Sequence, residues 1–86
     1  MKHAAAVLIV VAAFAAPAFA EEADVAKGAE DFVTVCGECH RGAERIAGRL
    51  EGEGEDKAAA LDTFLTTHYA EDETLRRDIV GYIMSL

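Results

Sequence analysis

This sequence of 86 residues lacks the patterns that indicate β-strands, interdomain linkers or internal repeats. No stretch alternates apolar and polar residues over the length of a strand, no segment is rich in proline or serine, and no unit recurs. The only proline, Pro17, lies within the first twenty residues. A short chain without strand or linker signals is expected to form a single all-α domain.

Positive charge is also scarce. Beyond residue 20 the chain has seven lysine and arginine residues against 16 aspartate and glutamate residues, a net charge of −9. This charge argues against nucleic acid and anionic membranes as partners. It favours a protein partner with a basic docking patch, whose association weakens as the salt concentration rises. Alternatively, the carboxylates only keep the protein soluble.

A hydrophobic run long enough to cross a bilayer is missing as well. The apolar segment Ala4–Ala16 has 13 residues, whereas a spanning helix needs about 20. It follows a short basic start, ends at Pro17 and precedes small residues at the positions that signal peptidase recognises. We expect residues 1–20 to be a signal peptide cleaved after Ala20, which exports the chain to the periplasm; an uncleaved anchor is the alternative. Residues 21–86 then form one small domain without a membrane span.

The chain has two cysteines, and their spacing predicts a cofactor. Residues 36–40 are Cys-Gly-Glu-Cys-His, the attachment pattern of c-type haem. On one turn of helix, Cys36 and Cys39 lie on the same side, where each can bind one vinyl group of a porphyrin. His40 is then directed at the iron as its proximal ligand. We therefore expect one haem c per chain.

Other interpretations of the two cysteines are less consistent with the rest of the sequence. In an exported protein, Cys36 and Cys39 could form a disulfide. A thioredoxin-like redox pair belongs to a strand–helix context, which this chain lacks. A zinc site needs a second pair of ligands, and His68 is the only other histidine beyond residue 20.

Apolar residues with helical spacing predict three or four helices. Residues 43–50 are expected to form a short second helix, and the acidic, glycine-containing segment 51–55 a solvated loop. The third helix should run to about residue 68. Aspartates are expected to cap the first, third and last helices: Asp24, Asp56 and Asp72. The expected apolar faces are Val25, Ala29, Phe32, Val33 and Cys36 in the first helix, Leu61, Phe64, Leu65 and His68 in the third, and Leu75, Ile79, Tyr82, Ile83 and Leu86 in the last.

With two flanking features, residues 36–40 make the chain resemble the class I c-type cytochromes, the family of small soluble haem proteins that includes mitochondrial cytochrome c. That family carries a glycine and an aromatic residue eight and four positions before the first haem cysteine, where this chain has Gly28 and Phe32. Its last helix typically has the sequence Asp-Leu-Ile-Ala-Tyr-Leu, and residues 78–83 here are Asp-Ile-Val-Gly-Tyr-Ile. The resemblance covers about half of residues 21–86. It implies a cytochrome c-like fold, in which the helices wrap around one covalently attached haem. Gly28 would then let the two terminal helices cross closely, with Phe32 and Tyr82 filling the crossing.

The sixth ligand of the iron is where the chain departs from this family. The usual distal methionine lies in a loop before the last helix, but Met84, near the end of the chain, is the only methionine beyond residue 20. His68 lies before the last helix instead. We expect His68 to be the distal ligand, with Met84 or an open iron as alternatives. The family's proline after the proximal histidine is also missing, so another group must orient the His40 ring.

These expectations imply a protein that carries single electrons between redox proteins in the periplasm. An iron with two imidazole ligands would have a lower reduction potential than one with histidine and methionine. The alternatives are a haem protein that binds a diatomic gas at an open distal site, and the electron-accepting subunit of a dehydrogenase. We expect no enzymatic activity, because no nucleophile and base are arranged for hydrolysis and one attachment motif means one haem.

Three arginines, Arg41, Arg45 and Arg49, recur every four residues and would share one face of a helix. They could pair with the haem propionates. The more ordinary expectation is a solvated face that pairs with Glu38 and Glu44.

Overall fold

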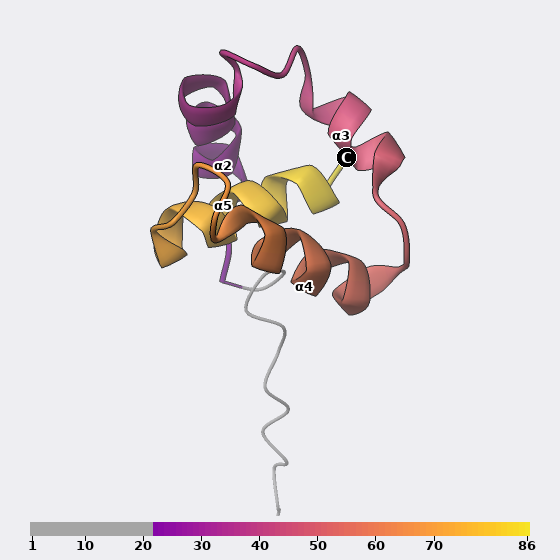
Figure 1. Cartoon of the computed structure of the whole chain (residues 1–86). Helices are drawn as coiled ribbons and strands as arrows, with labels where there is room; N and C mark the ends of the chain where they lie inside the picture. Colours follow the sequence, from indigo (N-terminus) through magenta and orange to yellow (C-terminus); the bar gives the residue numbers. More distant parts are fainter. Residues whose placement is uncertain (1–21) are drawn as a thin grey trace, which may run out of the picture.

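Residues 22–86 are described by a computed structural model of the chain, and their backbone is helical (Figure 1). Four α-helices and one π-helical turn follow one another in this part: α2 (Val25–Asp31), η1 (Phe32–Cys36), α3 (Ala43–Arg49), α4 (Gly54–Leu65) and α5 (Glu73–Met84). No strand occurs within residues 22–86, which confirms the expected all-α class.

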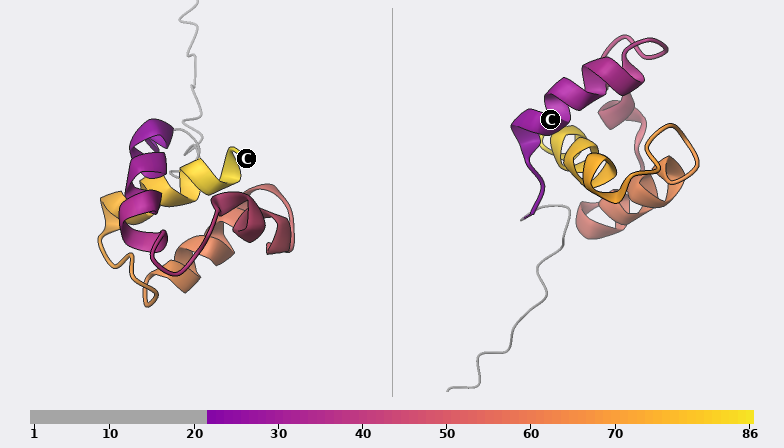
Figure 2. Two further views of the ribbon diagram at one scale, coloured as in Figure 1. Left: turned by 90° about the horizontal axis from the view of Figure 1, so that it is seen from above. Right: turned by 90° about the vertical axis from the view of Figure 1, so that its left-hand side faces the viewer.

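Helix α2 lies across α5, and this is the most extensive contact between two helices of the structure (Figures 1 and 2). A Cβ atom placed on Gly28 would lie 2.0 Å from the carbonyl oxygen of Asp78 and 2.9 Å from Cβ of Tyr82. Only glycine therefore allows this approach, which confirms the role expected for Gly28. The rings of Phe32 and Tyr82 fill the crossing with their centroids 6.0 Å apart. Such a tilted pair contributes about 0.5–1.5 kcal/mol beyond the area it buries.

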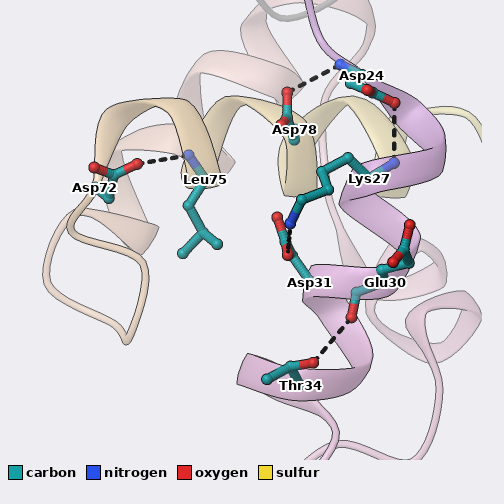
Figure 3. A network of polar contacts seen from close by, with 8 residues as sticks. All are labelled: Asp24, Lys27, Glu30, Asp31, Thr34, Asp72, Leu75 and Asp78. Carbon is teal, nitrogen blue, oxygen red and sulfur yellow. Dashed lines mark hydrogen bonds and ion pairs between the residues drawn. The ribbon is translucent and has the colours of Figure 1, made fainter.

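Hydrogen bonds of aspartate side chains fix the start of α2 against α5 (Figure 3). The buried carboxylate of Asp78 accepts a hydrogen bond of 2.9 Å from the backbone N–H of Asp24. Asp24 in turn caps α2 by accepting from the N–H of Lys27 at 3.0 Å, as predicted. Asp72 caps α5 in the same way and accepts from the N–H of Leu75 at 2.9 Å. Two of the three predicted caps are thus confirmed.

The hydrophobic core is centred on α5, where Ile79 and Val80 have no exposed surface. Helix α4 packs along α5 through Leu61 and Leu65, and α3 adds Ala43. The complete set of buried apolar residues is Phe32, Ala43, Ala58, Leu61, Leu65, Ala70, Ile79, Val80 and Ile83.

The start of α4 differs from the expectation. The helix begins at Gly54, inside the predicted loop 51–55, and its N-cap is Glu53, so the prediction of Asp56 as the cap is wrong. Gly52 and Gly54 have φ angles of +90° and +53°, which let the chain turn within a shorter loop. Asp56 lies in the first turn instead, where a carboxylate interacts favourably with the helix dipole.

The end of α5 also differs. The helix ends at Met84, and Leu86 lies two residues beyond it with half of its surface exposed. The predicted apolar stripe therefore stops at Ile83, because Leu86 is no longer on a helical face.

The proposed signal peptide, residues 1–20, and its cleavage site lie outside the described residues. In residues 22–86, no helix has the length and apolar character that crossing a membrane requires.

Candidate functional site

The chain leaves α2 through the π-helical turn η1. The backbone N–H of Gly37 donates a hydrogen bond of 2.9 Å to the carbonyl oxygen of Phe32, five residues earlier. Such turns add one residue to a helical turn and are frequent at functional sites. Val33, expected on the apolar face of the first helix, lies in η1 and is 70 % exposed. The expected face is therefore wrong for Val33, and also for Val25, which lies in α2 and is 41 % exposed.

Residues 36–40 form a closed turn that contains both cysteines and His40. The carbonyl oxygen of Cys36 accepts hydrogen bonds from the N–H groups of Cys39, at 3.2 Å, and His40, at 2.9 Å. A Cβ atom on Gly37 would lie 2.4 Å from the carbonyl oxygen of Val33, so a larger residue would displace this turn from η1. The turn therefore holds the two thiols and the imidazole close to one another.

A cavity of about 370 Å³ lies beside this turn. Its volume falls within the range of small-molecule and cofactor sites, about 300–1,000 Å³. It is lined by Val35, Cys36, Glu38, Cys39, His40, His68 and Tyr69. The first five belong to η1 and the turn after it, and the last two to the turn after α4. The four residues predicted to bind the haem, Cys36, Cys39, His40 and His68, thus line the same cavity. The alternative ligand Met84 does not line it.

The imidazole rings of His40 and His68 lie close together, with centroids 6.2 Å apart and planes inclined by 60°. An imidazole nitrogen binds a metal such as zinc at about 2.0–2.1 Å, so a metal held between two imidazoles places their centroids roughly 6 Å apart. The observed separation fits this arrangement. Two rings in ordinary aromatic contact lie at the same distance. The two thiols that line the same cavity therefore distinguish this site from such a contact. These residues fit a haem bound through two thioether bonds and two imidazoles.

His68 reaches the cavity from a tight turn, not from the helix predicted to extend to it. Helix α4 ends at Leu65, and the N–H of His68 donates to the carbonyl oxygen of Leu65 at 3.1 Å, a 3₁₀-type bond. Tyr69 then adopts a left-handed φ of 64°, which ends the helical course of the chain. The predicted end of α4 at about residue 68 is therefore wrong. The apolar spacing continues to His68, but the backbone hydrogen bonds change from the α-helical to the 3₁₀ type before that residue.

Two aromatic rings flank His68. The ring centroid of Phe64 lies 4.5 Å from that of His68, and the centroid of Tyr69 lies 5.0 Å from it. Phe64 is 56 % exposed and Tyr69 73 % exposed. The prediction that Phe64 shares the buried face of Leu61 and Leu65 is therefore wrong, since only the two leucines are buried. The sequence analysis did not identify Tyr69 as a residue of the site. Its position directly after the candidate ligand His68 could have indicated this role.

Arg76 of α5 holds the segment that follows His68. Its Nη1 donates to the carbonyl oxygens of Ala70, at 3.2 Å, and Glu71, at 2.8 Å. Its Nε donates to the carboxylate of Asp62 in α4 at 2.7 Å. One guanidinium group thus joins two helices to the segment between them. The sequence did not predict this role, because nothing in the local pattern distinguishes Arg76 from the neighbouring arginine.

No disulfide joins Cys36 to Cys39 in the structure. Cys36 is half-buried and Cys39 exposed, and burial raises the pKa of the Cys36 thiol. Redox-active thiols of the thioredoxin type instead have a lowered pKa. Nor does the described part of the chain bring together three or more histidine, cysteine or acidic side chains in a way that could hold a metal ion, as a zinc site requires.

Met84, the alternative distal ligand, lies elsewhere. It lines a separate cavity of about 290 Å³ between α3 and the end of α5, together with Ile83 and Leu86. The structure does not bring Met84 to the cavity that contains His40.

The three arginines of the predicted basic face are all exposed. Arg41 precedes α3, so only Arg45 and Arg49 belong to that helix. Among residues 22–86, none of the three forms an ion pair, and the expected pairs with Glu38 and Glu44 are not formed.

A scan against protein-family models and searches of the curated proteins and of the solved structures found no match to this chain. What the cavity binds is therefore inferred from its own residues.

Proposed function

We propose that this chain is an electron-transfer protein that carries one haem c, attached through Cys36 and Cys39, with His40 and His68 as axial ligands. The observation that supports this most strongly is the shared cavity. Two thiols and two imidazoles line it, and the imidazole centroids are 6.2 Å apart. A haem bound there would supply reversible one-electron chemistry.

The residues around the cavity have distinct tasks in this proposal. His40 follows directly on the second attachment residue and would serve as the proximal ligand. His68 would occupy the distal side and so keep diatomic gases away from the iron. Two imidazoles stabilise reduced iron less than an imidazole and a thioether, which gives a lower reduction potential. The rings of Phe64 and Tyr69 beside His68 would cover part of the porphyrin and exclude water.

The charge of the protein supports a partner of opposite charge. Residues 21–86 carry a net charge of −9, and Glu38 lies on the lining of the cavity itself. A redox protein with a basic docking patch would be attracted over several ångströms, and salt would weaken the encounter. The segment 1–20 supports export, so we place this electron transfer in the periplasm.

The decisive experiment compares wild type with His68→Ala and Met84→Leu after production in a host that attaches haem c. Absorption spectra of the reduced proteins are recorded with and without carbon monoxide. If His68 ligates the iron, wild type and Met84→Leu resist carbon monoxide, whereas His68→Ala binds it readily. Met84→Leu is the matched control, because Met84 lines the other cavity.

Two other outcomes would contradict the proposal. A wild type that binds carbon monoxide as rapidly as His68→Ala has an open distal site, and the gas-binding alternative then replaces the electron carrier. A wild-type protein that emerges without colour, with both thiols free, refutes the haem proposal.

A further inference from the structure

We infer that Arg76 is a positioning residue, whose guanidinium group fixes the turn that presents His68 to the cavity. The inference rests on the proposed function in one respect, the task of His68 as an iron ligand. The contacts that support it do not depend on haem.

Little of the turn after α4 is buried, and its backbone hydrogen bonds run back to α4 and not to α5. Thr66, Thr67 and Tyr69 are exposed, and His68 is only partly buried. The left-handed backbone of Tyr69 is unfavourable for a bulky residue and persists only where the surroundings impose it. Beyond Tyr69, Ala70 is the first fully enclosed residue, with 1 % of its surface exposed.

Arg76 acts at the point where the turn rejoins the core. It donates to the carbonyl oxygens of Ala70 and Glu71, the two residues that follow the left-handed position. The same group binds Asp62, three residues before the end of α4. One side chain therefore joins the last part of α4 to the residues that follow the turn. The pair is shielded from water, since the side chains of Arg76 and Asp62 are 12 % and 23 % exposed.

The next residue provides a matched control. Arg77 has the same charge and helix, but its Nη1 contacts the carboxylate of Glu22 at 3.5 Å, far along the chain from the turn. A change at Arg77 alters the charge of α5 equally without touching the turn.

The test uses haem-loaded wild type and the variants Arg76→Gln, Arg76→Lys and Arg77→Gln. Two quantities are measured: the fraction of reduced protein that binds carbon monoxide, and amide hydrogen exchange at residues 66–71. Because a hydrogen bond with a charged partner is worth roughly tenfold in an equilibrium, we expect Arg76→Gln to raise both quantities about tenfold. Arg77→Gln should stay within about twofold of wild type. Arg76→Lys should be intermediate, since an ammonium group keeps the charge but cannot span all three acceptors.

The opposite results overturn the inference. If Arg76→Gln lowers the unfolding temperature but matches Arg77→Gln in exchange at residues 66–71 and in carbon monoxide binding, Arg76 has only a general structural role. If Arg76→Gln does not fold, Arg76→Lys decides by the same two measurements. If the wild type contains no haem, the proposed function fails, and hydrogen exchange alone then decides whether Arg76 holds the turn.

Discussion

The crossing of α2 and α5 and the cavity beside residues 36–40 differ in what their apolar side chains contact. At the crossing, Phe32 packs on Tyr82 and Ile79 is completely enclosed. Tyr69, which lines the cavity, and Phe64, which packs on His68, leave more than half of their surface exposed. The crossing is enclosed by the protein itself, whereas the two rings beside the cavity contact His68 and are otherwise largely exposed. Exposed apolar surface beside a cavity marks a binding site.

This difference implies that the two regions depend on a ligand to different degrees. A ligand that binds only the folded chain stabilises what it contacts. Haem would therefore contribute to the stability of the turns at 36–40 and 66–69, while Gly28 and the Asp24–Asp78 hydrogen bond hold the crossing without it. Substitutions beside the cavity should therefore abolish haem binding, whereas substitutions at the crossing should lower the stability of the fold.

The largest expected effect comes from removing both sulfur atoms. The double variant Cys36→Ser, Cys39→Ser should lose all covalently attached haem, because no thioether bond can form. Extraction with acidified acetone, followed by haem staining of a denaturing gel, measures this. Met84→Leu serves as the control and should keep its stain. Haem that resists extraction in the double variant would mean that attachment does not involve these two residues.

The next largest effect is expected at the crossing. Gly28→Ala should destabilise the protein by about 3 kcal/mol, since a backbone oxygen 2.0 Å from the new methyl group cannot move aside without separating the helices. Gly48→Ala is the matched control, because nothing lies within 4 Å of its added Cβ. It should stabilise α3 by roughly 0.5–1 kcal/mol. Urea unfolding of both proteins checks the difference, and equal midpoints would show that α2 and α5 are not in close contact at Gly28.

The crossing was expected because the chain resembles the class I c-type cytochromes, in which a glycine and an aromatic residue occur at the positions of Gly28 and Phe32. The caps Asp24 and Asp72 were predictable from local signals, because each precedes an apolar helical pattern. Four of the residues that line the cavity were predictable for a different reason. Haem attachment requires specific side chains, so Cys36, Cys39 and His40 stand out, and His68 follows as the only other imidazole beyond residue 20.

The backbone that joins these residues was not predictable. Val33 lies in η1, where the 3.6-residue period on which the expected face was based is interrupted. Phe64 belongs to the regular part of α4 and is exposed, although its spacing placed it on the face of Leu61 and Leu65. The π-helical turn η1 and the 3₁₀-type bond at His68 depend on which carbonyl accepts a given N–H, and apolar spacing does not record that choice. Arg76 escaped notice because its acceptors are backbone carbonyls, which every residue possesses.

The smallest effect expected is at Tyr69, and it tests whether the cavity wall is strained. At a φ of 64°, glycine has no steric cost, whereas a β-branched residue loses about 1–2 kcal/mol. Tyr69→Gly should therefore unfold at a higher temperature than Tyr69→Val, by an amount that corresponds to about 1–2 kcal/mol. Because the Tyr69 side chain is largely exposed, loss of packing contributes little to either variant. Equal stability of the two variants would contradict a left-handed backbone at this position. If the variants differ in stability but bind carbon monoxide to the same extent when loaded with haem, the conformation of Tyr69 supports the fold without directing His68, and that task falls to Arg76 alone.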